Sequence, residues 1–145
     1  MERSQPHVVV IGGGFAGLWC TRALASAPLQ ITLVDRANHH LFQPLLYQVA
    51  TAGLSAGDIA APLRHILSSQ RNVTVRLGEV NAIDTATQRV SLADGMTLAY
   101  DYLVITTGPK LSFDEVPGAG PSTSSAAGHT HSVCTVGHAE AFWAQ

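Results

Sequence analysis

Two short apolar runs with a helical pattern between them organise the start of the chain. Residues 7–11 and 31–34 are mostly apolar, which predicts two strands buried in a parallel sheet. Residues 15–26 follow the spacing of a helix, and Pro28 ends it because proline cannot continue a helix. The order strand, helix, strand is typical of an α/β fold.

The next segment predicts two more helices. Residues 45–51 predict a short helix closed by Gly53. A longer helix is expected to begin at Ser55 or Asp58, either of which can cap it, and to run through about Ser68. Its expected buried face is made of apolar residues at helical spacing: Ile59, Leu63, Ile66 and Leu67.

From residue 73 onward the apolar positions recur with a period of two, which predicts strands over residues 73–77 and 80–84. Residues 89–92 and 96–99 flank an Asp-Gly pair that favours a hairpin. Residues 102–105 predict a further buried parallel strand. We therefore expect an α/β, Rossmann-like domain with a parallel sheet, helices on both faces and an antiparallel insertion.

Three glycines, Gly12, Gly14 and Gly17, lie where the first predicted strand turns into the helix. The first allows a tight turn, the second lets backbone approach a pyrophosphate, and the third lets the helix pack on the strand. Phosphates favour a helix N-terminus, where N–H groups lack partners. Asp35 follows near the offset at which a carboxylate accepts hydrogen bonds from a ribose. The stretch predicts dinucleotide binding.

Composition excludes several other classes of protein. The 145 residues are 46% hydrophobic and 12% charged, which is enough apolar material for the core of one folded domain. The net charge of -2 provides no positive electrostatic field that would attract nucleic acid, so we expect no nucleic-acid partner. Cys20 and Cys134 are far apart in the sequence and match neither a disulfide framework nor the ligand spacing of a zinc site. His39 and His40 have no further metal-ligating residues at a suitable spacing, so we expect no metal site. We expect no signal peptide and no membrane span.

Longer motifs carry a resemblance to a known family. Residues 9–105 resemble the N-terminal FAD domain of type II NADH:quinone oxidoreductases, within the pyridine nucleotide-disulfide oxidoreductase-like superfamily. The segments that carry the resemblance are residues 11–18, 32–36, 38–50, 57–60 and 100–104. Residues 106–145 instead resemble sulfide:quinone oxidoreductases and flavocytochrome c sulfide dehydrogenases, in which a cysteine at the position of Cys134 faces the flavin and carries sulfur. The N-terminus of a helix predicted over residues 136–143 would also favour its thiolate.

The resemblance implies FAD as the cofactor and assigns residues to its site. The pyrophosphate would meet Gly12, Gly14, Phe15, Ala16 and Gly17, and the adenosine ribose would meet Asp35 with Arg36 beside it. The backbone of Val80 would meet adenine, and Thr107 and Gly108 would complete the flavin site. The loop containing His40, Gln43, Pro44 and Leu45 would run beside the flavin.

The resemblance also implies an organisation and a function. Residues 1–116 would form the N-terminal portion of the FAD-binding domain, 117–132 a linker rich in Gly, Pro and Ser, and 133–145 the start of a following helix. We expect this chain to be a truncated part of a parent flavoprotein that has two dinucleotide-binding domains. The 145-residue chain by itself is expected to be inactive. The parent would pass electrons from NADH through FAD to a quinone, as a cytoplasmic enzyme peripheral on the inner face of the plasma membrane, with a membrane-contacting part absent here. Sulfide as donor, with Cys134 as the redox cysteine, and a non-catalytic FAD-binding remnant remain open as alternatives.

Overall fold

The computed structural model describes residues 5–109, which divide into two units. Unit 1 contains residues 5–40 and 62–108, and unit 2 contains residues 41–61 and 109. The strands of unit 1 are β1 (His7–Ile11), β2 (Gln30–Asp35), β5 (Val73–Leu77), β6 (Val80–Asp84), β7 (Arg89–Leu92), β8 (Thr97–Ala99) and β9 (Tyr102–Ile105). Its helices are α1 (Phe15–Ala23) and α4 (Leu63–Ile66).

Unit 2 consists of short helices. These are η1 (Gln43–Leu45), α2 (Leu46–Ala50) and α3 (Ala56–Ile59). Their apolar side chains form a small cluster of their own, in which Leu46, Val49 and Ile59 are buried. The strands β3 (His39–Leu41) and β4 (Ala60–Pro62) pair with each other, and the boundary between the units runs through both.

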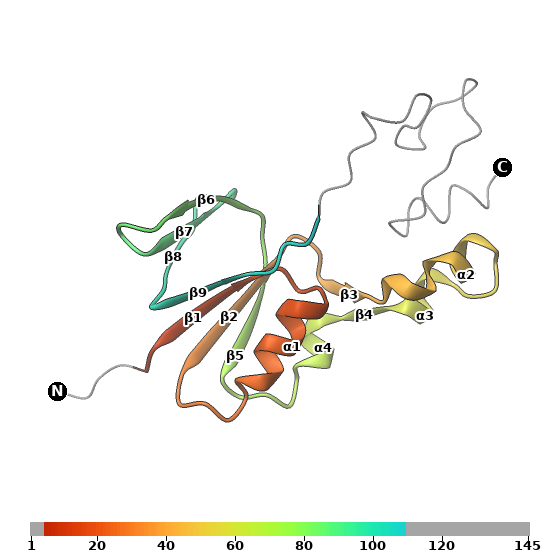
Figure 1. Cartoon of the computed structure of the whole chain (residues 1–145), viewed down its shortest axis with the longest axis horizontal. Helices are drawn as coiled ribbons and strands as arrows, with labels where there is room; N and C mark the ends of the chain where they lie inside the picture. The colour runs from red at the N-terminus through yellow and green to blue at the C-terminus, as the bar shows by residue number, and fades with distance from the viewer. Residues whose placement is uncertain (1–4, 110–145) are drawn as a thin grey trace, which may run out of the picture. The chain divides into compact units, whose positions relative to one another are not determined.

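A parallel sheet with the order β5-β2-β1-β9 forms the centre of unit 1 (Figure 1). β1 pairs in parallel with β2 on one side and with β9 on the other. The register places Ile11 beside both Val34 and Ile105, so the carboxyl ends of the three strands meet at one edge. These strands and the α/β class agree with the pattern of apolar runs, which confirms the predicted fold class.

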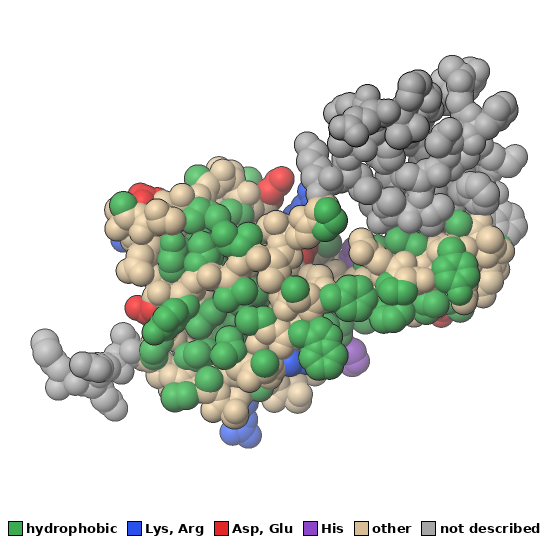
Figure 2. Space-filling model, viewed as in Figure 1, with side chains coloured by type: hydrophobic (Ala, Val, Ile, Leu, Met, Phe, Trp, Pro, Cys, Tyr) green, Lys and Arg blue, Asp and Glu red, His purple; other side chains and the backbone are tan. Residues whose placement is uncertain are grey.

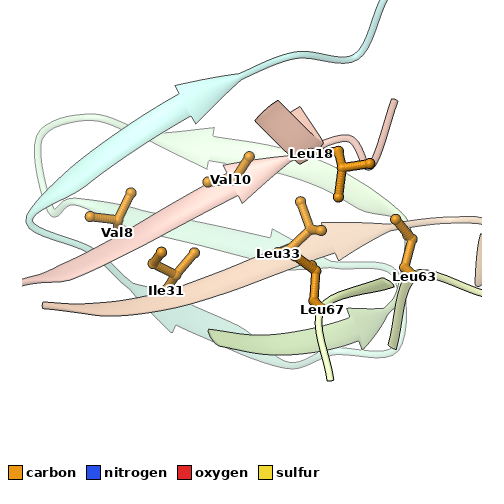
Figure 3. Close-up of a cluster of buried hydrophobic side chains, with 7 residues drawn as sticks. All are labelled: Val8, Val10, Leu18, Ile31, Leu33, Leu63 and Leu67. Atoms are coloured by element: carbon orange, nitrogen blue, oxygen red, sulfur yellow. The ribbon is translucent and has the colours of Figure 1, made fainter. Parts of the chain in front are cut away.

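One face of this sheet is covered by helices. The cluster of buried apolar side chains in Figure 3 joins β1, β2, α1 and the segment of α4. It consists of Val8, Val10, Leu18, Ile31, Leu33, Leu63 and Leu67. On the outer side of α1, Trp19 remains 66% exposed, and Figure 2 shows hydrophobic side chains gathered over this part of unit 1.

The other face of the sheet is covered by β-structure, and the expectation of helices on both faces was wrong for the described residues. Val9, Ile11 and Val34 of the parallel sheet pack against Val90 and Leu92 of β7. The sheet β6-β7-β8 thus covers the face of the parallel sheet that a second layer of helices was expected to cover. The predicted insertion and its hairpin are confirmed, with Gly95 of the turn at a φ of 84°.

Helix α1 ends at Ala23, three residues before the predicted end. The following residues form turns with hydrogen bonds to the third residue back, such as the Ala27 N–H to the Leu24 carbonyl. Asn72 stabilises this arrangement, because its Nδ2 donates to the Leu24 carbonyl at 3.0 Å and to the Ala27 carbonyl at 3.3 Å. A residue distant in sequence therefore supplies hydrogen-bond donors to carbonyls that follow the end of the helix.

The single helix predicted from Ser55 or Asp58 to Ser68 was wrong. Ser55 and Asp58 do form the capping interaction, but α3 ends after one turn and the extended strand β4 follows. Proline disfavours helical backbone at the residue before it and cannot lie inside a helix, so Pro62 separates α3 from α4. The predicted buried face is consequently divided: Ile59 packs in unit 2 and Leu63 in unit 1.

The last described strand is less buried than its composition predicts. β9 is parallel to β1 as expected, but it is an edge strand among the described residues. Tyr102 is 63% and Ile105 59% exposed. The apolar run was interpreted as a strand covered on both faces, and the structure buries only part of it.

Candidate functional site

The candidate site lies at the carboxyl edge of the parallel sheet, where the chain leaves β1. The Gly12 N–H donates to the Val34 carbonyl, and the Thr106 N–H donates to the Ile11 carbonyl, both at 2.8 Å. Gly12 has a φ of 103°, and a Cβ there would overlap the backbone carbonyl of Thr106. Only glycine therefore suits this turn, which confirms the predicted role of the first glycine.

Gly17 faces the same turn from α1. A Cβ on Gly17 would overlap the Gly12 carbonyl oxygen and lie 2.7 Å from Oγ1 of Thr106. The absence of a side chain lets the first turn of α1 pack directly on the strand end. This close approach is what the third glycine of the motif predicts.

Thr106 belongs to this site, although the sequence assigned the cofactor contact in this turn to Thr107 and Gly108. The Thr106 hydroxyl lies 2.9 Å from the Ile11 carbonyl oxygen and 3.0 Å from that of Gly12, and donates to this pair of acceptors. The half-buried side chain thus ties the end of β9 to the glycine turn. The register between β1 and β9 would have revealed it, since the residue after Ile105 stands opposite Gly12.

Gly14 is the N-cap of α1, and its backbone is extended with φ -70° and ψ -165°. Nothing lies within 4 Å of the position a Cβ would occupy there. Gly14, Phe15 and Ala16 are consecutive exposed residues at the start of the helix. The first turn of α1 therefore presents backbone and open space together, an arrangement that can accept an anionic group.

Asp35, the last residue of β2, lies at the same turn. Its Oδ2 accepts the Gly13 N–H at 2.5 Å, and its Oδ1 accepts the Ala37 N–H at 2.6 Å. Because each carboxylate oxygen has a second lone pair, the group can still accept hydrogen bonds from hydroxyls of a ligand. The structure thus brings Asp35 together with the glycines, while the neighbouring Arg36 is exposed.

His40 approaches the turn from β3. Its Nδ1 lies 3.0 Å from the Gly13 carbonyl oxygen. Its ring meets that of Phe15 edge to face, with the ring centroids 4.8 Å apart and an interplanar angle of 86°. Two residues that the sequence assigned to a cofactor site are therefore in contact.

A second group of predicted residues meets at an open cavity of about 280 Å³. Val80 and Thr107 line it together with Ile11, Ile105 and residues of β6. Gly108 follows with a φ of 71°. The predicted contacts of these residues with FAD stay predictions.

Four of the predicted site residues belong to other parts of the chain. Gln43, Pro44 and Leu45 form η1 in unit 2, and their place beside a flavin stays a prediction. Cys134, with the proposed linker and final helix, lies outside the described residues. Among residues 5–109, no helix is both long and apolar enough to cross a bilayer.

Comparisons with a family profile and with known proteins point to the same family of flavoproteins. The profile of the family described as pyridine nucleotide-disulphide oxidoreductase matches residues 6–145. Type II NADH:quinone oxidoreductase NdhA of Mycobacterium tuberculosis is 52% identical over 110 residues, which cover 74% of this chain and 23% of that protein. The chain thus spans about a quarter of the length of such relatives.

Solved structures agree with this assignment. The sulfide:quinone oxidoreductase from Aquifex aeolicus superposes with a TM-score of 0.80 at 34% identity, covering 94% of this chain and 30% of that one. NDH2 from Plasmodium falciparum gives a TM-score of 0.77 over 96% of this chain and 28% of that one, at 19% identity, which shows the fold alone. These matches confirm the resemblance predicted from the sequence, and the family is one of FAD-binding flavoprotein oxidoreductases.

Proposed function

This chain belongs to the pyridine nucleotide-disulphide oxidoreductase family, and from that premise we propose that it is the FAD-binding part of a flavoprotein that passes electrons from NADH to a quinone. The observation that carries the proposal is the glycine turn with the Asp35 carboxylate hydrogen-bonded to it. The similarity to a type II NADH:quinone oxidoreductase, which has the highest identity of the relatives described above, favours NADH as donor.

The described residues fit FAD at this turn. Open space at Gly14 leaves room for a pyrophosphate to approach the backbone, and the first turn of α1 offers N–H groups and the positive end of its dipole. Asp35 keeps lone pairs for the ribose hydroxyls. The bound FAD would supply the redox chemistry, while this chain binds and orients it.

Each residue has a distinct task in this proposal. The N–H groups of residues 14–17 hold the phosphates, and Gly12 and Gly17 let helix and strand approach closely enough to form the turn. Asp35 selects the ribose, with Arg36 beside it. Val80 and Thr107 line one cavity. In this proposal the backbone of Val80 contacts the adenine, and Thr107 and Gly108 complete the flavin site.

The parent protein would reduce a membrane quinone as a peripheral enzyme on the cytoplasmic face of the plasma membrane. Reduction of a quinone is supported by relatives named a type II NADH:quinone oxidoreductase and a demethylphylloquinone reductase. Binding of the complete gene product to quinone-containing vesicles, measured by co-sedimentation, tests the peripheral location. Recovery of all protein in the supernatant would contradict the proposed membrane contact.

Sulfide is the second candidate donor. The Aquifex aeolicus structure matches over nearly the whole chain, and Cys134 lies in the part whose sequence resembles sulfide-oxidising enzymes. Under this alternative Cys134 carries sulfur, and Cys134→Ser abolishes reduction by sulfide but leaves reduction by NADH nearly unchanged.

Anaerobic bleaching of the flavin in the complete gene product separates these functions. We expect NADH to bleach the flavin absorbance and sulfide to leave it unchanged. Bleaching by sulfide alone would assign the chain to the sulfide-oxidising branch. A flavin that stays bound and is reduced by neither donor would instead indicate a non-catalytic FAD-binding module.

A further inference from the structure

The glycine turn is held by side chains at two successive peptide groups. Asp35 accepts the N–H of Gly13, which belongs to the peptide between Gly12 and Gly13. His40 contacts the Gly13 carbonyl oxygen, which belongs to the next peptide, between Gly13 and Gly14. A carbonyl oxygen only accepts, so Nδ1 of His40 carries the proton in this contact.

The contact at the carbonyl also determines where the next N–H points. The Gly13 carbonyl and the Gly14 N–H lie in one planar peptide and, in the trans form, point in opposite directions. No cis peptide occurs among the described residues. By holding the carbonyl, His40 therefore turns the Gly14 N–H to the opposite side of that peptide.

This peptide needs such an anchor because glycine stands on both sides of it. Without Cβ atoms, Gly13 and Gly14 have a wide choice of backbone angles, and rotation of the peptide between them meets little steric resistance. A rotated peptide would replace a donor N–H by a carbonyl oxygen, whose partial negative charge repels a phosphate. The edge-to-face contact with Phe15 holds the His40 ring in the donating position.

We propose that His40 is a positioning residue for the phosphate-binding turn: its Nδ1–H fixes the Gly13–Gly14 peptide so that the Gly14 N–H is available to the pyrophosphate. The inference rests on the proposed FAD site and adds to it a residue that acts through the backbone. It differs from the expectation that His40 lies beside the flavin, since the ligand group served is the pyrophosphate.

Two substitutions distinguish the effect of the His40 Nδ1–H donor from the effect of its aromatic ring. His40→Phe keeps an aromatic ring against Phe15 but removes the donor. His40→Asn removes the ring but keeps an N–H donor on the atom bonded to Cγ, where histidine has Nδ1. His39→Phe is the matched control, because the Nδ1 of His39 lies 3.4 Å from Oδ1 of the neighbouring Asn38 and not at the glycine turn.

Equilibrium titration of the 145-residue chain with FAD, ADP and adenosine provides the first test. We expect His40→Phe to weaken FAD and ADP about tenfold, and adenosine, which lacks the pyrophosphate, less than about twofold. His40→Asn recovers most of the affinity, and His39→Phe has that of wild type. Unchanged affinity in His40→Phe, an equal loss for adenosine, or no recovery in His40→Asn would overturn the proposal.

The tautomer of His40 provides a test that does not depend on FAD. A long-range 1H–15N NMR spectrum of the wild-type chain should show a proton on Nδ1 of His40. An Nδ1 without a proton would overturn the inference even if FAD binds. A wild-type chain that binds neither FAD nor ADP would refute the proposed function and the role toward pyrophosphate together, while the tautomer separately decides whether His40 holds the turn.

Discussion

The carboxylate of Asp35 accepts a hydrogen bond from the backbone N–H of Gly13, 22 residues earlier in the chain. The acidic residue at the end of β2 therefore stabilises the turn after β1 as well as being available to a ligand. We therefore expect loss of this side chain to change two properties, the free energy of unfolding and the affinity for FAD.

We expect Asp35→Ala to lower the free energy of unfolding by about 1–3 kcal/mol, because two half-buried backbone N–H groups lose their acceptor. Affinity for FAD should fall at least about tenfold. Urea unfolding and FAD titration measure the two effects. Asp84→Ala is a matched control, since Asp84 also accepts two backbone N–H groups, in an exposed turn of the antiparallel sheet. An equal loss of FAD affinity in both variants would contradict the site.

The glycines of the turn should respond differently to substitution. Gly14→Val adds a side chain in open space on extended backbone, so the fold should persist while approach of the pyrophosphate is blocked. Gly17→Ala places a methyl group on the Gly12 carbonyl and should lower the free energy of unfolding by about 3 kcal/mol. Circular dichroism melts and FAD titration distinguish the two. Gly57→Ala, in unit 2, should change neither property, and undiminished FAD affinity in Gly14→Val would refute the pyrophosphate site.

Thr106→Val tests the hydrogen bonds by which the Thr106 hydroxyl holds the glycine turn. Valine has the same shape but cannot donate to the Gly12 carbonyl, so we expect the free energy of unfolding to fall by about 1–2 kcal/mol. Thr107→Val is the adjacent control and should be nearly neutral, because Thr107 is exposed. Urea unfolding followed by circular dichroism compares the two. Equal stability of both variants would show that the Thr106 hydroxyl does not stabilise the turn.

The cap of α3 makes a pH-dependent contribution. The hydroxyl of Ser55 and then its N–H donate to Asp58 and hold the pKa of its carboxyl below its ordinary value of 3.8. A carboxyl with a lower pKa in the folded state stabilises the fold above that ordinary value, and this stabilisation is lost as the pH falls through the folded-state pKa. Asp58→Asn should therefore be less stable than wild type at about pH 6, and the difference should shrink as the pH falls below 3.8.

Urea unfolding at a series of pH values measures this difference. In a Ser55→Ala background the effect of Asp58→Asn should be smaller, because the donor with the largest effect on the pKa is gone. A stability difference that is constant across the pH range would show that ionisation of Asp58 is not its cause.

Much of the site could be predicted because its signals are local. Glycines between an apolar strand and a helix, followed by an acid after the next strand, reflect backbone angles and short connections that neighbouring residues decide. The positions of β1, β2 and the start of α1 followed from this pattern. The position of Asp35 at the turn followed too, because it requires only that the two strands be adjacent and parallel.

The tertiary structure decided what depends on distant partners. The helix expected through residue 68 failed because Pro62 and the pairing of β4 with β3 override an amphipathic pattern. The second face of the sheet received strands because β7 offered a buried apolar surface there.

By itself, then, the sequence determined the glycine turn, its acid and the α/β class, because local backbone geometry and apolar periodicity encode them. Only the tertiary structure decided that Thr106 holds Gly12 and that His40 holds Gly13, since these contacts span 94 and 27 residues. Their formation depends on how strands pair across the sheet, which no local pattern specifies.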